Sequence, residues 1–152
     1  MSASTPPAAP RRVPVEEGFF TIPERAGEPP RLLGSRCRAC GEVFFPRRLV
    51  CAKCLARDNA DVELGPRGRL YTWTYTHVPM FGALRADVGG YGVGQIDLPD
   101  GPRVQAVLDG GPKDFAIGME MELDLETLRV NAKGEEVVIF RFRPVSRPGG
   151  AS

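Results

Sequence analysis

Four cysteines carry the clearest chemical signal in this chain. They stand in two Cys-x-x-Cys pairs joined by ten residues: Cys37, Cys40, Cys51 and Cys54. A spacing of two residues lets both sulfurs of a pair face one ion, and the connection brings the second pair round to complete a tetrahedron. The pattern therefore predicts a zinc site with these four thiolates as ligands. Because four thiolates fill the coordination sphere, the zinc would be structural.

Two disulfides or a redox-active Cys-x-x-Cys are the rival interpretations of the cysteines, and both fit less well. The chain shows no signal peptide at its start, so we expect the reducing cytoplasm as its compartment. A thioredoxin-type site uses one such pair beside a βαβ unit, whereas this chain has two pairs. A site that holds iron, or that has lost its metal, is left open by the spacing.

The sequence contains few residues in patterns typical of catalytic sites. His77 is the chain's one histidine, and a lone histidine on a strand is usually a hydrogen-bonded structural residue. The acids at 120, 122, 124 and 126 alternate along one face of an expected strand, which indicates a solvated face and not a convergent pair. We find no nucleophile elbow, P-loop or dinucleotide fingerprint. We therefore expect no catalysis by the chain alone.

Charge is unevenly distributed along the chain. Residues 31–57 contain seven basic side chains and one acid, whereas residues 65–145 contain nine basic and eleven acidic ones. A positive cysteine segment on a slightly negative body suggests a local anion site and argues against a nucleic-acid groove. Arg47 and Arg48 are our candidates for that site, because guanidinium groups suit oxyanions. A solvated basic loop is the alternative.

These residues need elements to position them, and the composition favours short strands. The chain has 152 residues with 18 glycines and 15 prolines, and no apolar run long enough to span a membrane. We expect a disordered tail over residues 1–17, an extended arm and zinc ribbon over 18–60, and a flexible tail over 146–152. The arm's apolar residues, around a middle broken by proline and glycine, predict packing on another surface: Phe19, Phe20, Ile22, Leu32 and Leu33.

A polar linker over residues 55–68 should lead into five strands. Alternating patterns predict a strand within 68–79, a hairpin over 91–111 that turns at residues 99–101, and strands within 117–128 and 135–145. Within residues 117–128, every second side chain from Ile117 to Leu125 should point inward. Five strands without helices indicate a closed barrel, and we predict a mainly β chain: a rubredoxin-like zinc ribbon followed by a five-stranded OB-fold barrel over residues 65–145.

An aromatic stripe lies on the first barrel strand. Tyr71, Trp73 and Tyr75 occupy alternate positions, so they should share one face. In a barrel such residues usually fill the interior, although an OB-fold can also use aromatic side chains to stack bases. Single-stranded nucleic-acid binding is thus the second function hypothesis.

The order of these motifs resembles the DUF35 family. It runs from Cys-x-x-Cys-Gly through Phe45-Pro46-Arg47 to the second Cys-x-x-Cys and Gly-Arg-Leu-Tyr-Thr-Trp-Thr, and then to the later Ile-Gly-Met-x-Met-x-Leu and Phe-Arg-Phe-Arg-Pro stretches. Prolines before Cys37 depart from the short helix that many members place there.

This resemblance implies a non-catalytic zinc-ribbon and OB-fold subunit of a thiolase-like enzyme, either a thiolase or an aldolase acting on an acyl-CoA from aromatic or steroid degradation. It also implies that the CoA ester is a ligand of the complex. Arg47 or Arg48 would then meet a CoA phosphate or an acidic side chain of the partner subunit, and the apolar arm would be buried by that partner. No membrane is expected as a partner.

Overall fold

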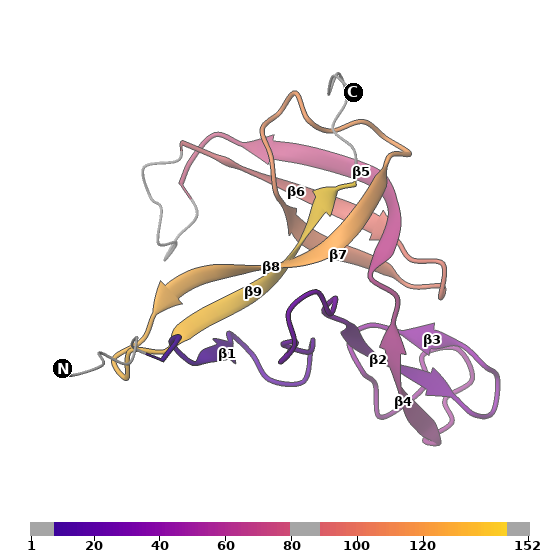
Figure 1. Cartoon of the computed structure of the whole chain (residues 1–152). Helices are drawn as coiled ribbons and strands as arrows, with labels where there is room; N and C mark the ends of the chain where they lie inside the picture. Colours follow the sequence, from indigo (N-terminus) through magenta and orange to yellow (C-terminus); the bar gives the residue numbers. More distant parts are fainter. Residues whose placement is uncertain (1–7, 80–88, 146–152) are drawn as a thin grey trace.

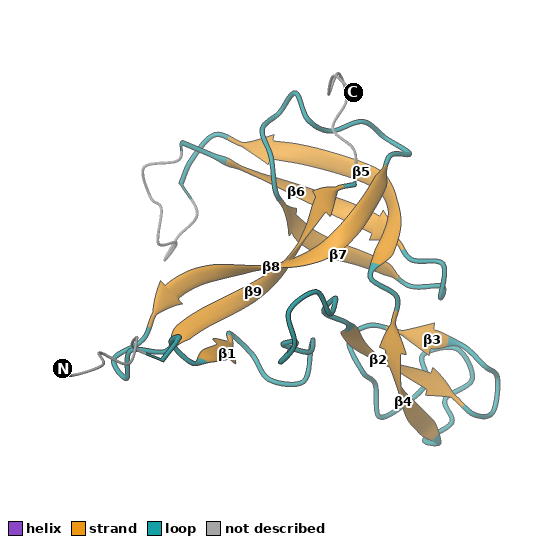
Figure 2. Cartoon of the chain, in the orientation of Figure 1, coloured by secondary structure: helices purple, strands orange, loops and turns teal. Residues whose placement is uncertain are grey.

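The computed structural model describes residues 8–79 and 89–145. The described chain is built of strands and loops and contains no helix (Figure 2). The strands are β1 (Arg12–Pro14), β2 (Leu32–Cys37), β3 (Val43–Phe44), β4 (Asn59–Leu64), β5 (Arg67–Thr76), β6 (Tyr91–Asp97), β7 (Arg103–Leu108), β8 (Glu120–Val130) and β9 (Glu136–Pro144).

Five of these strands close into a barrel, which Figure 1 shows beside the smaller sheet of β2, β3 and β4. The barrel order is β5-β6-β7-β9-β8, and β8 pairs again with β5. All of these pairings are antiparallel except β7 with β9. The predicted five-stranded OB-fold barrel is thus confirmed, because closure pairs the edge strands with each other.

The barrel interior follows the alternation of the sequence. Met121 and Leu123 of β8 are buried, while Glu122 and Asp124, which alternate with them, bond to the arginines of β9. Strand β6 places Gly94 inside, where a Cβ atom would lie 2.8 Å from a methyl carbon of Leu108. The glycine therefore lets larger side chains of neighbouring strands fill the barrel. Ile117 is an exception to the prediction, because it precedes β8 and is 72% exposed.

A β-bulge splits the aromatic stripe of β5. Leu70 pairs with Ile96 and Thr72 with Gln95, so Tyr71 is the extra residue. Tyr71 follows the inward Leu70 and is 48% exposed, and the extra residue reverses the alternation beyond it, so Trp73 faces the core. The predicted shared face is therefore wrong for Tyr71. Its ring lies instead under the guanidinium of Arg103, 3.3 Å from the ring centroid.

The ribbon sheet has the order β3-β2-β4. Strand β4 pairs with all of β2, from Leu32 with Leu64 to Cys37 with Asn59. It lies in the stretch that the sequence analysis treated as a linker, so that interpretation is wrong for residues 59–64. Alternation in Asn59–Leu64 is obscured because four of its six side chains are polar or small, and pairing with β2 decides the conformation.

The apolar arm packs within this chain, contrary to the prediction that a partner buries it. Phe20 is 5% exposed and bridges to Leu32, which is fully buried in β2. Aromatic rings link the arm, the ribbon and β9: the centroids of Phe20 and Phe45 each lie 5.7 Å from that of Phe140. We call Phe19, Phe20, Phe45 and Phe140 the phenylalanine cluster, and it joins the ribbon to the barrel.

The N-terminal region also differs from the prediction. Residues 1–7 of the predicted disordered tail lie outside the described residues, as does the predicted flexible tail over 146–152. Strand β1, however, lies within the predicted tail and pairs in parallel with β9. Val13 pairs with Val137, which is buried, and the amide of Val15 donates to the Val138 carbonyl, so pairing with β9 orders this segment.

Candidate metal centre

The two cysteine pairs form two similar turns at one end of the ribbon. The amide of Gly41 donates to the Cys37 carbonyl at 2.8 Å, and the amide of Leu55 donates to the Cys51 carbonyl at 3.0 Å. The amides of Cys37 and Cys51 bond in turn to the carbonyls of residues 42 and 56, both at 2.9 Å. The pairs are thus held in matching conformations, which aims two thiols from each turn at one point.

The four sulfur atoms have the spacing of a tetrahedral site. All four lie within 4.8 Å of one another, and the Cys37–Cys54 and Cys40–Cys51 sulfurs are 3.6 Å apart. Zinc–sulfur bonds of about 2.3 Å in a tetrahedron place sulfurs about 3.8 Å apart. The cysteines are free thiols, so the rival interpretation of two disulfides does not fit this arrangement. The four residues fit a zinc ion.

Backbone amides prepare the site for thiolates. The amide of Cys54, joined by that of Lys53, lowers the pKa of the Cys51 thiol to about 6 against the effect of burial. For Cys40 the amide of Glu42 acts in the same direction, but desolvation and the other thiols outweigh it and raise the pKa to about 12. The Cys51 thiolate therefore forms more readily than the Cys40 thiolate, and a bound divalent cation would favour both.

The residue after each pair has a left-handed backbone. Gly41 has φ of 79° and Leu55 has φ of 66°. Glycine adopts this region freely, whereas a residue with a Cβ atom loses about 1 kcal/mol there. Leu55 is also 75% exposed. In the sequence, only its position, which matches that of Gly41 after the first cysteine pair, indicates the left-handed backbone of Leu55.

Arg47 and Arg48, the predicted anion-binding residues, lie in different surroundings. Arg47 bonds to Asp61 of β4 at 3.1 Å, and its guanidinium lies against Gly18, where a Cβ atom would be 2.7 Å from a guanidinium nitrogen. Arg48 holds its guanidinium over the Phe44 ring at 5.3 Å, and its amide donates to the buried Ser35 hydroxyl. No local pattern indicates Asp61 or Ser35 as partners, because they come from neighbouring strands.

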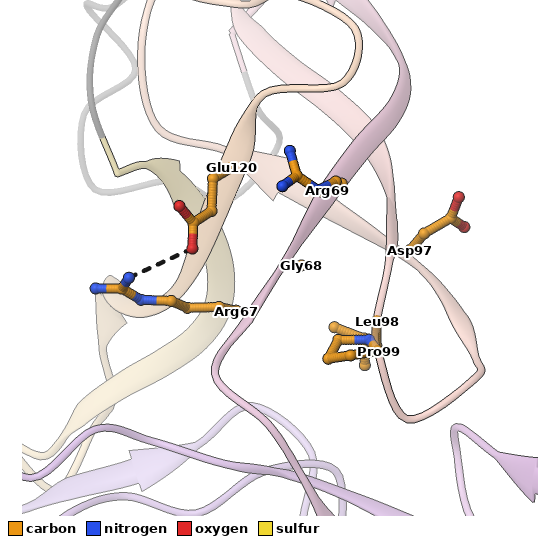
Figure 3. Close-up of a pocket in the computed structure, with 7 residues that line it drawn as sticks. All are labelled: Arg67, Gly68, Arg69, Asp97, Leu98, Pro99 and Glu120. Atoms are coloured by element: carbon orange, nitrogen blue, oxygen red, sulfur yellow. Dashed lines mark hydrogen bonds and ion pairs between the residues drawn. The ribbon is translucent and has the colours of Figure 1, made fainter.

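The barrel and the arm carry shallow hollows on their surfaces. Figure 3 shows one of about 420 Å³, lined by Arg67, Gly68, Arg69, Asp97, Leu98, Pro99 and Glu120. Arg67 pairs with Glu120 at 3.3 Å, and Asp97 points away and pairs with Arg103 at 2.6 Å. These lining residues include no nucleophile and no convergent acid pair.

His77 and the acids of β8 are also placed by the structure. His77 is exposed at the end of β5 and its ring contacts Tyr75. Glu122, Asp124 and Glu126 face the arginines of β9, so this outer face is a ladder of ion pairs. Among the described residues no helix is long and apolar enough to cross a membrane.

Comparisons with known proteins agree with this architecture. Residues 25–60 match the model of the ChsH2 rubredoxin-like zinc ribbon domain, and residues 61–126 match that of the ChsH2 C-terminal OB-fold domain. A DUF35 domain-containing scaffold protein of Methanocaldococcus jannaschii is 32% identical over 120 residues, covering 75% of this chain and 82% of the relative. The chain belongs to the DUF35 family.

Other DUF35 relatives carry names of enzyme subunits. The benzoylsuccinyl-CoA thiolase subunit BbsA of Thauera aromatica is 34% identical over 119 residues, which covers 78% of this DUF35 chain and 80% of BbsA. A solved chain of the Ltp2-ChsH2(DUF35) aldolase superposes with a TM-score of 0.61 at 28% identity, covering 76% of this chain and 86% of that one. The shared length spans both the ribbon and the barrel.

Proposed function

We propose that this chain is the small, non-catalytic subunit of an assembly in which a thiolase-like subunit acts on an acyl-CoA. The observation that carries the proposal is the 34% identity to a thiolase subunit across 78% of the chain. The likeness to a chain of an aldolase complex supports the same role. The thiolase-like subunit would supply the reacting groups, and we place the assembly in the cytoplasm, where thiols stay reduced.

In this role the zinc ribbon is a rigid structural part. We propose Cys37, Cys40, Cys51 and Cys54 as the ligands of one structural zinc ion, supported by the sulfur spacing. Such a small sheet buries too little apolar surface to fold without the metal. Zinc would therefore fix the surface that the ribbon presents to its partner.

We further propose that Arg47 and Arg48 form the basic part of this chain that meets an oxyanion in the complex, either a CoA phosphate or a carboxylate of the partner. Guanidinium groups suit both. Arg47 is already bonded to Asp61, which leaves Arg48 with more capacity for a new partner. The Arg47 side chain would then act mainly by holding the loop.

Purification of the untagged chain from its native source, with identification of the proteins that come with it, tests the assembly. We expect a thiolase-like subunit to co-elute in size-exclusion chromatography, and the isolated chain to cleave no CoA ester. A full-length chain that elutes alone, or that cleaves a CoA ester unaided, would contradict the proposal.

The arginine proposal has its own test in the reconstituted complex. Arg48→Ala should weaken either CoA-ester binding or subunit assembly, and the quantity that changes identifies the oxyanion. Arg129→Ala is the matched control, because Arg129 is an exposed arginine near the end of β8. If Arg47→Ala and Arg48→Ala together leave both quantities unchanged, neither arginine meets an oxyanion.

A further inference from the structure

We propose that the second cysteine turn is a docking surface for the thiolase-like subunit, with Leu49 and Leu55 as its apolar centre and Arg48 and Arg57 as its charged border. We call these four residues the knuckle surface. The inference rests on the proposed function, and it names the part of this chain that the partner recognises.

The two leucines are exposed on neighbouring segments. Leu49 is 89% exposed and Leu55 is 75% exposed. The amide of Cys51 bonds to the carbonyl of Ala56, and the side chain of Asn59 donates to the Leu49 carbonyl at 2.9 Å. These bonds hold residues 49–51 alongside residues 56–59, so the leucines belong to one region of the surface.

Stability of the chain does not explain Leu55. Gly41 occupies the matching position in the first turn, with the same hydrogen bond and the same left-handed backbone. A glycine would relieve the strain at position 55, and Leu55 is absent from the hydrophobic core and from the residues packed against it. An exposed apolar side chain on a strained backbone points to a contact outside the chain.

The charges around these leucines define the partner's chemistry. Two other basic residues of the ribbon have acidic partners within the chain: Arg38 pairs with Asp58, and Lys53 pairs with Glu42. Across the described parts of the chain, by contrast, no carboxylate oxygen lies within 4.0 Å of a charged nitrogen of Arg48 or Arg57. A complementary surface therefore offers an apolar socket bordered by carboxylates.

A protein partner fits this surface better than the other occupants. Two copies of the knuckle surface would bring four guanidinium groups together, which disfavours a symmetric dimer. A nucleic acid would use a basic groove that tracks its backbone, and it would leave the two leucines in water. Because Arg48 lies next to Leu49 in this surface, the oxyanion that it meets is a carboxylate of the partner and not a CoA phosphate.

The experiment measures binding of the full-length zinc-loaded chain to the thiolase-like subunit with which it co-purifies. Leu49→Asp and Leu55→Gly should each weaken the affinity about tenfold or more, because each removes a side chain from the apolar centre. Arg48→Gln with Arg57→Gln should slow association at low salt and matter little at high salt. Ile117→Asp, at a similarly exposed apolar residue on the barrel, should leave the affinity unchanged.

Zinc content and the denaturation midpoint of each variant separate docking from folding. Leu55→Gly should retain zinc and be at least as stable as wild type while it binds more weakly, a combination that a purely structural Leu55 cannot give. Binding of Leu49→Asp and Leu55→Gly at wild-type affinity overturns the inference and leaves the proposed function standing. Equal weakening by Ile117→Asp also overturns it. If the wild-type chain binds no thiolase-like subunit, the proposed function fails and this inference fails with it.

Discussion

Replacing Phe20 with alanine tests whether the arm belongs to this chain's own core. Phe20 is 5% exposed, and its ring meets that of Phe140 at a centroid distance of 5.7 Å. Burying an aromatic side chain removes about 150–250 Å² from water, at about 25 cal/mol per Å². Because alanine keeps part of this burial and the ring contact adds a little, we expect Phe20→Ala to lower the free energy of unfolding by about 3–4 kcal/mol.

The assay is urea denaturation of the isolated, zinc-loaded chain, followed by tryptophan fluorescence. Trp73 is the one tryptophan of the sequence, and it packs against Phe115 in the barrel, far along the chain from the mutated arm. A lower midpoint therefore shows that the arm stabilises the barrel through the phenylalanine cluster. A change of this size should also lower Tm by about 10 °C.

Two controls sharpen the test. Phe20→Leu keeps most of the apolar volume and should cost about 1 kcal/mol. Leu49→Ala removes an exposed side chain and should change the stability by less than about 0.5 kcal/mol. If Phe20→Ala also stays within that margin, the arm does not contribute to the fold of the isolated chain, and the original expectation of burial by a partner returns.

Three further predictions concern the ribbon and the barrel surface. Elemental analysis should find about one zinc per chain in wild type and a loss of zinc in Cys51→Ser, whereas zinc retained at full occupancy in that variant would exclude Cys51 as a required ligand. Leu55→Gly should raise the free energy of unfolding by up to about 1 kcal/mol, and Gly41→Ala should lower it by about 1 kcal/mol. If the two variants shift the denaturation midpoint in the same direction, the two turns are not equivalent. Arg141 lies within 3.4 Å of carboxylate oxygens of Asp109, Asp124 and Glu126, so Arg141→Ala should cost about 2 kcal/mol at neutral pH, and a cost below that of the exposed control Arg129→Ala would show that solvent screens these pairs.

Local patterns were enough to predict the barrel and the residues that form the four-cysteine cluster. The spacing of Cys37, Cys40, Cys51 and Cys54 limits how the sulfurs can be arranged, since each pair lies on one short turn. The alternation within β8 predicts that Met121, Leu123 and Leu125 face inward, because successive residues of a strand point to opposite sides. These features depend on neighbours in the sequence, and they are visible without a structure.

Contacts between distant segments were decided by the tertiary structure. The bulge that puts Tyr71 and Trp73 on opposite faces is a shift of register between β5 and β6, and β4 becomes a strand because β2 offers it a partner. Phe20 is buried by Phe140, which lies 120 positions later in the chain. Arg47 meets Asp61 and Gly18 only after the ribbon closes. Each depends on which strands become neighbours, a property of the packed chain that no local pattern specifies.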